Sequence, residues 1–195
     1  RINANFFVFK EPVMSAELEQ QQALSDLKDV VDTLGVTVAI PRSPYIPDLQ
    51  SMLEPIWVHQ PEVLTFHFGL PPQQIIEKAH SLGIAVGVTA TSLEEALMIQ
   101  SADIDFVVAQ GIEAGGHRGI FDPHGVDQQL TIQDLVQELD KHLQIPIVAA
   151  GGLMDGRDVR DIIQAGASAA QMGTAFLVTN EAGSSPAHRR FVLAK

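Results

Sequence analysis

The side chain in this sequence best suited to proton transfer is His117, which lies in a glycine-rich segment. The apolar stretch Phe106–Gln110 leads into Gly111-Ile112-Glu113-Ala114-Gly115-Gly116-His117. Glycines let the backbone approach a ligand closely, and an imidazole exchanges protons near neutral pH. The pattern predicts a ligand-binding loop with His117 as its reactive group, although a flexible turn carrying a solvated histidine would show the same pattern.

Two later segments also place glycines where an apolar stretch ends. They are Ala149-Ala150-Gly151-Gly152 and Gln171-Met172-Gly173-Thr174. Paired glycines at a helix entrance expose backbone N–H groups that bind phosphate, and a threonine hydroxyl adds a further donor. Two successive segments of this kind predict a phosphate cup for a phosphorylated cofactor.

Two polar side chains stand within or at the end of apolar stretches, Asn5 and His67. A buried amide needs hydrogen-bond partners, so Asn5 either faces a cofactor or makes a hydrogen bond inside the core. His67 is a weaker candidate: it either touches substrate or is a hydrogen-bonded structural residue.

Composition restricts the class of ligand. The formal net charge of -12 and the pI of about 4.8 argue against nucleic acid and anionic membranes, which need a positive surface. The absence of cysteine excludes disulfides and favours a cytoplasmic setting, and no apolar run reaches the roughly 20 residues of a membrane helix. The spacing of the acidic and histidine residues around His117 matches no short zinc or calcium pattern, so we expect a small-molecule substrate and no metal.

The elements that must position these residues alternate between short strands and longer helices. The expected strands are Ile2–Phe9, Val63–Phe68, Ala85–Thr89, Phe106–Gln110, Ile147–Ala150 and Ala169–Met172, with a weaker one at Val36–Ile40. The expected helices are Ser15–Leu34, Pro72–Leu82, one that Ser92 opens, Ile132–Leu143 and Gly156–Gln164. The proline-rich stretch from Pro41 to Pro61 is interpreted as an irregular connection.

This alternation predicts βα units on a parallel sheet, either open and doubly wound or closed into a barrel. A complete eight-stranded barrel takes about 250 residues, and six units fit into the 195 residues here. Phosphate loops after the last two strands are usual in barrels, so the glycine pairs favour a partial α/β barrel. We expect a single domain over residues 1–195, and, because the chain starts at Arg1 and enters a strand at once, a missing N-terminal segment.

The three glycine-bearing motifs, in their order and spacing, resemble those of the nitronate monooxygenase (2-nitropropane dioxygenase) family of FMN-dependent TIM-barrel enzymes. The resemblance covers nearly the whole chain, and flavin-dependent enoyl-acyl-carrier-protein reductases are similar to this family. It implies a TIM-type barrel without its first two βα units, whose first strand carries an Ala-Pro-Met-like flavin contact in family members. Some members also carry a Lys where this chain has Gly87-Val88-Thr89.

The resemblance further implies FMN as cofactor and His117 as catalytic base. The implied FMN contacts are Asn5, Gln110, Gly115, Gly151, Gly152, Gln171, Met172, Gly173 and Thr174. The implied reaction is oxidation of alkyl nitronates, or of nitroalkanes after proton loss, with molecular oxygen as electron acceptor. Two alternatives stay open, an NAD(P)H-dependent reductase of enoyl thioesters or quinones and a non-catalytic phosphate-ligand-binding barrel fragment, and the oligomeric state, homo-oligomer included, is also open.

Overall fold

The computed structural model of the chain describes residues 2–13, 16–40 and 42–194. The chain divides into two compact units, a larger one of Arg1–Val8 with Leu53–Lys195 and a smaller one of Phe9–Met52. The single domain expected over residues 1–195 stays a prediction. In the described part of the chain, no helix has both the length and the apolar character needed to cross a membrane.

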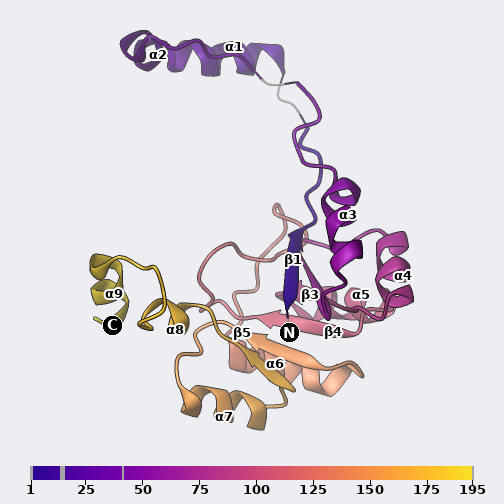
Figure 1. Cartoon of the computed structure of the whole chain (residues 1–195). Helices are drawn as coiled ribbons and strands as arrows, with labels where there is room; N and C mark the ends of the chain where they lie inside the picture. The colour runs from indigo at the N-terminus through magenta and orange to yellow at the C-terminus, as the bar shows by residue number, and fades with distance from the viewer. Residues whose placement is uncertain (1, 14–15, 41, 195) are drawn as a thin grey trace. The chain divides into compact units, whose positions relative to one another are not determined.

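A six-stranded parallel sheet forms the centre of the larger unit (Figure 1). Its strands are β1 (Asn3–Phe7), β2 (Val63–His67), β3 (Ala85–Ala90), β4 (Phe106–Gln110), β5 (Ile147–Ala150) and β6 (Ala169–Gln171). Each strand pairs with the next one along the chain. This order is that of a barrel wall, whereas a doubly wound sheet reverses its direction. The sheet is therefore part of a TIM-type α/β barrel, as predicted, and the six expected strands are confirmed.

Helices connect the successive strands of the larger unit, and each turns an apolar side toward the sheet. They include α4 (Gln73–Ser81), α5 (Leu93–Ser101), α6 (Ile132–His142) and α7 (Gly156–Gln164). Ser92, Thr131 and Asp155 cap three of them as expected, each accepting a hydrogen bond from a backbone N–H of the first turn. The apolar sides of these helices pack on the sheet, so that Ile76, Leu135 and the strand residues Phe66 and Val107 are almost fully buried.

The helix α3 (Leu49–His59) corrects the interpretation of residues 41–61 as an irregular connection, of which Pro41 lies outside the described residues. Proline removes a backbone donor and usually ends a helix, yet Pro55 lies inside α3. The fully buried Leu53 shows why the helix persists: packing of its apolar side outweighs the lost hydrogen bond. The remaining helices of the larger unit, α8 (Thr174–Leu177) and α9 (Pro186–Leu193), were not anticipated.

The smaller unit holds α1 (Glu17–Asp26) and α2 (Lys28–Leu34), which replace the single helix expected over 15–34. Ser15, where that helix was expected to start, lies outside the described residues. The prediction of a strand at Val36–Ile40 is wrong. This segment contains β-branched side chains, which favour strands, but among the described residues it has no strand to pair with. No residue of α1 or α2 is buried, so neither helix gains stability from a packed core.

Candidate functional site

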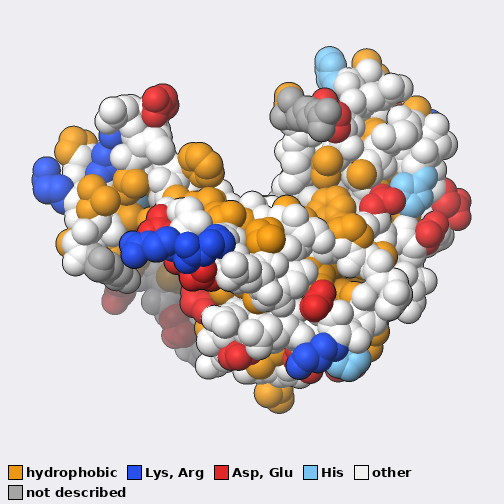
Figure 2. Space-filling view, turned by 90° about the horizontal axis from the view of Figure 1, so that it is seen from below, with side chains coloured by type: hydrophobic (Ala, Val, Ile, Leu, Met, Phe, Trp, Pro, Cys, Tyr) orange, Lys and Arg blue, Asp and Glu red, His pale blue; other side chains and the backbone are white. Residues whose placement is uncertain are grey.

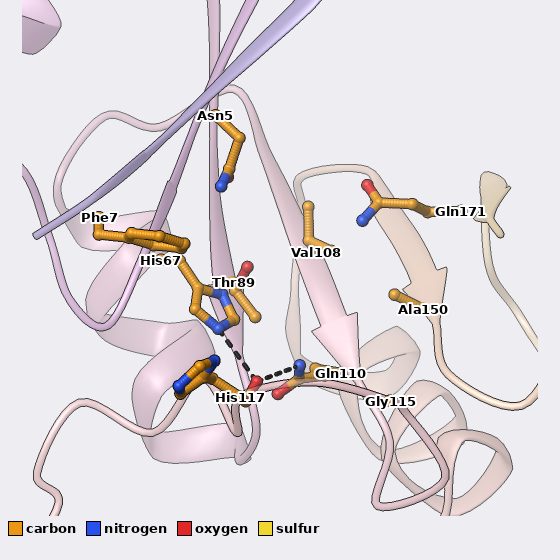
Figure 3. Close-up of a pocket in the computed structure, with 10 residues that line it drawn as sticks. All are labelled: Asn5, Phe7, His67, Thr89, Val108, Gln110, Gly115, His117, Ala150 and Gln171. Carbon is orange, nitrogen blue, oxygen red and sulfur yellow. Dashed lines mark hydrogen bonds between the residues drawn. The ribbon is translucent and has the colours of Figure 1, made fainter. Parts of the chain in front are cut away.

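The carboxyl ends of the strands surround a cavity of about 230 Å³ (Figure 3). Parallel strands all point their carboxyl ends to the same edge of a sheet, so residues distant in sequence meet there. Six of the residues singled out in the sequence line this cavity: Asn5, His67, Gln110, Gly115, His117 and Gln171. Four lining residues were not anticipated: Phe7, Thr89, Val108 and Ala150.

His117 lies in the loop after β4 with its side chain exposed at this cavity. Its imidazole meets the ring of Phe68 almost perpendicularly, with 6.1 Å between the ring centroids and an interplanar angle of 86°. Phe68 directly follows β2 and has a φ of 73°, a left-handed conformation that is rare for a bulky residue. Residues held in such conformations concentrate at functional sites, and here the strained residue is the aromatic neighbour of His117.

The backbone carbonyl of His117 accepts two side-chain hydrogen bonds, drawn as dashed lines in Figure 3. Gln110 Nε2 donates to this oxygen over 3.0 Å, and His67 Nε2 lies 3.2 Å from it. A carbonyl oxygen only accepts, so the Nε2 atom of His67 carries the hydrogen. His67 thus makes the structural hydrogen bond that one reading of the sequence expected, and its ring also lines the cavity.

The loop of residues 111–131 is held by contacts along its length. Arg118 forms a paired ion contact with Asp127, with Nε 2.8 Å from one carboxylate oxygen and Nη2 3.0 Å from the other. Hydrogen bonds from Arg118 lower the pKa of Asp127. Phe121 N donates to the carboxylate of buried Glu95 over 2.7 Å. These contacts argue against the alternative that the segment is a free, flexible turn.

A second cavity of about 580 Å³ adjoins the first and is lined mainly by glycines and other small residues. The two cavities share Gln110, Gly115, Ala150 and Gln171. The remaining predicted contacts, which line only the second cavity, are Gly151, Gly152, Met172, Gly173 and Thr174. The sequence-predicted phosphate cup and the His117 loop therefore face two adjoining cavities.

Backbone geometry at the cup requires glycine. Gly151 and Gly152 have φ values of 122° and 68°, and a Cβ on Gly152 would lie 2.9 Å from Glu113 Cβ. A Cβ on Gly173, in contrast, would meet no atom within 4 Å. Among the residues described as lining the cup there is no lysine or arginine, so backbone N–H groups, the Thr174 hydroxyl and the side-chain amide of Gln171 are the donors available to an anion.

The amide of Asn5 points its nitrogen into the first cavity (Figure 3). Its carbonyl oxygen lies 3.0 Å from the hydroxyl of buried Thr65, and this hydroxyl in turn lies 3.0 Å from Asn3 Nδ2. A chain of donors runs from Asn3 through Thr65 to Asn5. It occupies the acceptor end of Asn5 and leaves the Nδ2 hydrogens for a ligand.

The family model for nitronate monooxygenase matches residues 2–195 of the chain. The chain belongs to the nitronate monooxygenase family. It is 38% identical to a nitronate monooxygenase of Paraburkholderia phytofirmans over 197 residues, covering 99% of this chain and 53% of that protein. It is 45% identical to a nitronate monooxygenase of Pseudomonas aeruginosa over 139 residues, covering 71% of this chain and 40% of that protein.

Solved structures agree with the family and with the barrel fold. Nitroalkane oxidase from Streptomyces ansochromogenes superimposes with a TM-score of 0.79 at 32% identity, covering 96% of this chain and 54% of that one. FabK from Thermotoga maritima superimposes with a TM-score of 0.63 at 28% identity, covering 85% and 51%. The chain thus spans about half the length of these structures and of the curated relatives it matches.

Three residues that support the site were missed at the level of sequence: Thr65, Phe68 and Glu95. Glu95 stands three residues after the helix-capping Ser92, the spacing typical of a capping box. Its carboxylate instead accepts hydrogen bonds from Thr91 N over 2.6 Å and Thr91 Oγ1 over 2.9 Å, as well as from the His117 loop. The sequence signals a capping role for Glu95 through its place at the third helical position. It contains no signal for the long-range hydrogen bond with Phe121.

The pKa of His67 gives a prediction about stability. Burial lowers this pKa from its ordinary value of 6.5, and the nearby His117 lowers it further against the opposing hydrogen bond to the His117 carbonyl. Between the folded-state pKa and 6.5 the unfolded chain binds more protons, so stability falls as the pH drops through that window. We expect His67→Gln, which does not titrate, to flatten the pH dependence of the free energy of unfolding, measured by urea titration between about pH 5 and 7.

The wild-type chain, measured over the same pH range, is the reference for this slope. A slope that is equally steep in wild type and His67→Gln would contradict the assigned role of His67.

Proposed function

We propose that the protein containing this chain is an FMN-dependent enzyme that oxidises alkyl nitronates, or nitroalkanes after proton loss, with molecular oxygen as electron acceptor. The observation that carries the proposal is the pair of adjoining cavities, of which His117 lines one and the glycine cup lines the other. Family membership supports the reaction class. The structural likeness to nitroalkane oxidase supports a nitro compound as substrate.

The residues present fit FMN in their chemistry. The cup offers open space at Gly173 and backbone donors around Gly151 and Gly152, which suits a phosphate. The adjoining cavity offers the amides of Asn5 and Gln171 to a flat polar ring. FMN, when bound, supplies the redox chemistry that no amino-acid side chain can perform.

His117 has two roles open to it, depending on the substrate. As a neutral imidazole it removes the acidic α-proton of a nitroalkane, and as an imidazolium it donates to an oxygen of the nitronate anion. Phe68 restricts the imidazole from one side, and the loop contacts hold the backbone. A nitronate is already deprotonated, so it needs no base.

Asn5 is proposed as an FMN contact, and its orientation by Thr65 gives a prediction. Thr65→Val keeps the side-chain volume but removes the hydroxyl that occupies the Asn5 carbonyl, so the amide can turn away from the cavity. One lost hydrogen bond of this kind is expected to raise the Kd for FMN by about tenfold. Thr65→Ser, which keeps the hydroxyl, should bind FMN nearly as the wild type does, with quenching of FMN fluorescence as the measurement.

The proposed function is tested on the full-length protein by its visible spectrum and by anaerobic mixing. We expect a flavin spectrum that an alkyl nitronate bleaches, followed by recovery when oxygen is admitted. Bleaching by NADH and not by a nitronate would replace the proposal with the reductase alternative. A colourless protein that gains no flavin spectrum with added FMN would leave the phosphate-ligand-binding alternative.

A further inference from the structure

We propose that His67 and Gln110 are positioning residues that jointly hold the backbone carbonyl of His117 and thereby aim its imidazole into the cavity. The catalytic meaning of this inference rests on the proposed function, while the positioning itself does not. The carbonyl oxygen has two acceptor sites, and the two side-chain donors come from β2 and β4, the strands on either side of β3.

Gln110 uses both ends of its amide on the same loop. Nε2 donates to the His117 carbonyl over 3.0 Å, and Oε1 accepts from Gly119 N over 2.7 Å. If the Gln110 amide were turned around, its NH2 group would meet the Gly119 N–H, and its oxygen would meet the His117 carbonyl oxygen. Only the observed orientation therefore allows both hydrogen bonds. With Gln110 only 8% exposed, an unmade hydrogen bond here would leave a buried polar group without a partner.

Arg118, which lies between the two clamped residues, reinforces the arrangement. Its guanidinium donates to the backbone carbonyl of Gln110 and pairs with Asp127. Side chain and backbone of Gln110 therefore both bind residues 117–119. The end of β4 is joined to this segment by three separate hydrogen bonds.

His67 supplies the second donor from a defined position. Its ring lies 4.4 Å from the ring of Phe68 and 6.0 Å from that of Phe7, measured between centroids. The backbone of Gly119 approaches it so closely that a Cβ there would lie 2.7 Å from His67 Cε1. The ring is thus held between aromatic side chains and the loop that it binds.

The imidazole of His117 itself has few restraints. Its side chain is exposed, and within the described residues it makes no side-chain hydrogen bond, only the edge contact with Phe68. The backbone conformation at residue 117 sets the direction of its Cα–Cβ bond and therefore the point from which the imidazole enters the cavity. Side chains that fix this backbone act on catalysis through His117 without touching the substrate.

The first test uses Gln110→Glu in the full-length protein. The substitution keeps the acceptor for Gly119 N and places a second carboxylate oxygen against the His117 carbonyl, which repels it. Gln100→Glu adds the same charge on α5 at a glutamine that is outside both cavities and that accepts from Gln144 N. The readout is the carbon–proton NMR signal of the His117 imidazole, assigned by its loss in His117→Ala.

We expect the His117 signal of Gln110→Glu to move toward that of a free imidazole, because the ring leaves Phe68, while Gln100→Glu leaves it in place. An unmoved signal in Gln110→Glu would overturn the positioning role. This readout requires no nitronate turnover, so it stands even where the proposed function fails in the bleaching experiment.

The second test asks whether His67 acts through its hydrogen bond to the His117 carbonyl or through direct contact with the substrate. His67→Phe keeps a ring beside Phe68 but has no donor, whereas His67→Gln places an amide nitrogen near the position of Nε2. Displacement of a catalytic group by about 1 Å costs about 100-fold in rate, so we expect kcat on nitroalkanes to fall by 10- to 100-fold in His67→Phe, with KM changed little. His67→Gln should recover most of this loss, and equal losses in both variants would show that His67 acts on the substrate itself.

Discussion

His117→Ala is expected to lower kcat/KM for neutral nitroalkanes by about 10²- to 10⁴-fold, the usual contribution of a general base. Preformed nitronates should lose far less, because their α-proton is already gone. The residue lies at the cavity that adjoins the glycine cup, and its side chain is exposed there. Steady-state oxygen consumption with both forms of one substrate measures the difference.

The His117→Ala variant should retain its flavin, because the proposed phosphate contacts at Gly151, Gly152 and Thr174 do not involve the imidazole. Flavin content per protein is therefore the control. Equal losses on nitroalkane and nitronate would remove the base role and leave His117 as a binding group for both.

Gly119→Ala is expected to damage both folding and turnover. A Cβ at this position would lie 2.7 Å from His67 Cε1 and 2.7 Å from Thr89 Cγ2, and neither is the far end of a flexible side chain. Overpacking of this kind costs about 1–3 kcal/mol, and the alternative, movement of the loop, breaks the hydrogen bond to Gln110 Oε1. Urea unfolding and nitroalkane turnover measure the two effects.

Gly156→Ala provides the comparison for Gly119→Ala. Gly156 begins α7, and a Cβ there would meet no atom within 4 Å. Alanine favours the helical conformation more than glycine does, so this variant should be as stable as the wild type or slightly more so. If Gly119→Ala behaves in the same way, the loop does not approach His67 as closely as the structure indicates.

Much of the barrel wall was predictable because its strands are short apolar runs between turn residues. The bounds of Phe106–Gln110 and Ile147–Ala150 agree with the structure at every residue. Local preference failed where tertiary context decides the conformation. Val36–Ile40 resembles a strand but has no partner to pair with, and α3 forms although it contains Pro55.

The members of the candidate site were largely visible in the sequence, but the way they are held was not. Glycines at strand ends indicate where a backbone approaches a ligand, and that signal is local. The hydrogen bond of Glu95 to Phe121 and the pair of donors on the His117 carbonyl join residues from different βα units. Such contacts depend on the register between strands, which a single sequence does not encode in any short pattern.

The face in Figure 2 shows hydrophobic side chains gathered along its hollowed part, with charged side chains around them. Apolar residues are indeed exposed near both edge strands of the sheet, with Ile2 beside β1 exposed by 68% and Phe176 after β6 by 62%. In the described part of the chain, β1 and β6 each pair with a single strand. These exposed apolar residues therefore lie near the two end strands, each of which leaves one edge unpaired in the described part of the chain.

The composition of the glycine cup has a kinetic consequence for an anionic ligand. With a net charge of -12, the long-range field of the chain repels a phosphate and slows its approach. Backbone dipoles act only over short distances, so at the proposed phosphate site they would hold the group once it has entered without attracting it from solution. Slow entry combined with close-range retention suits a cofactor that is acquired once and stays through many turnovers, rather than one that exchanges in each cycle.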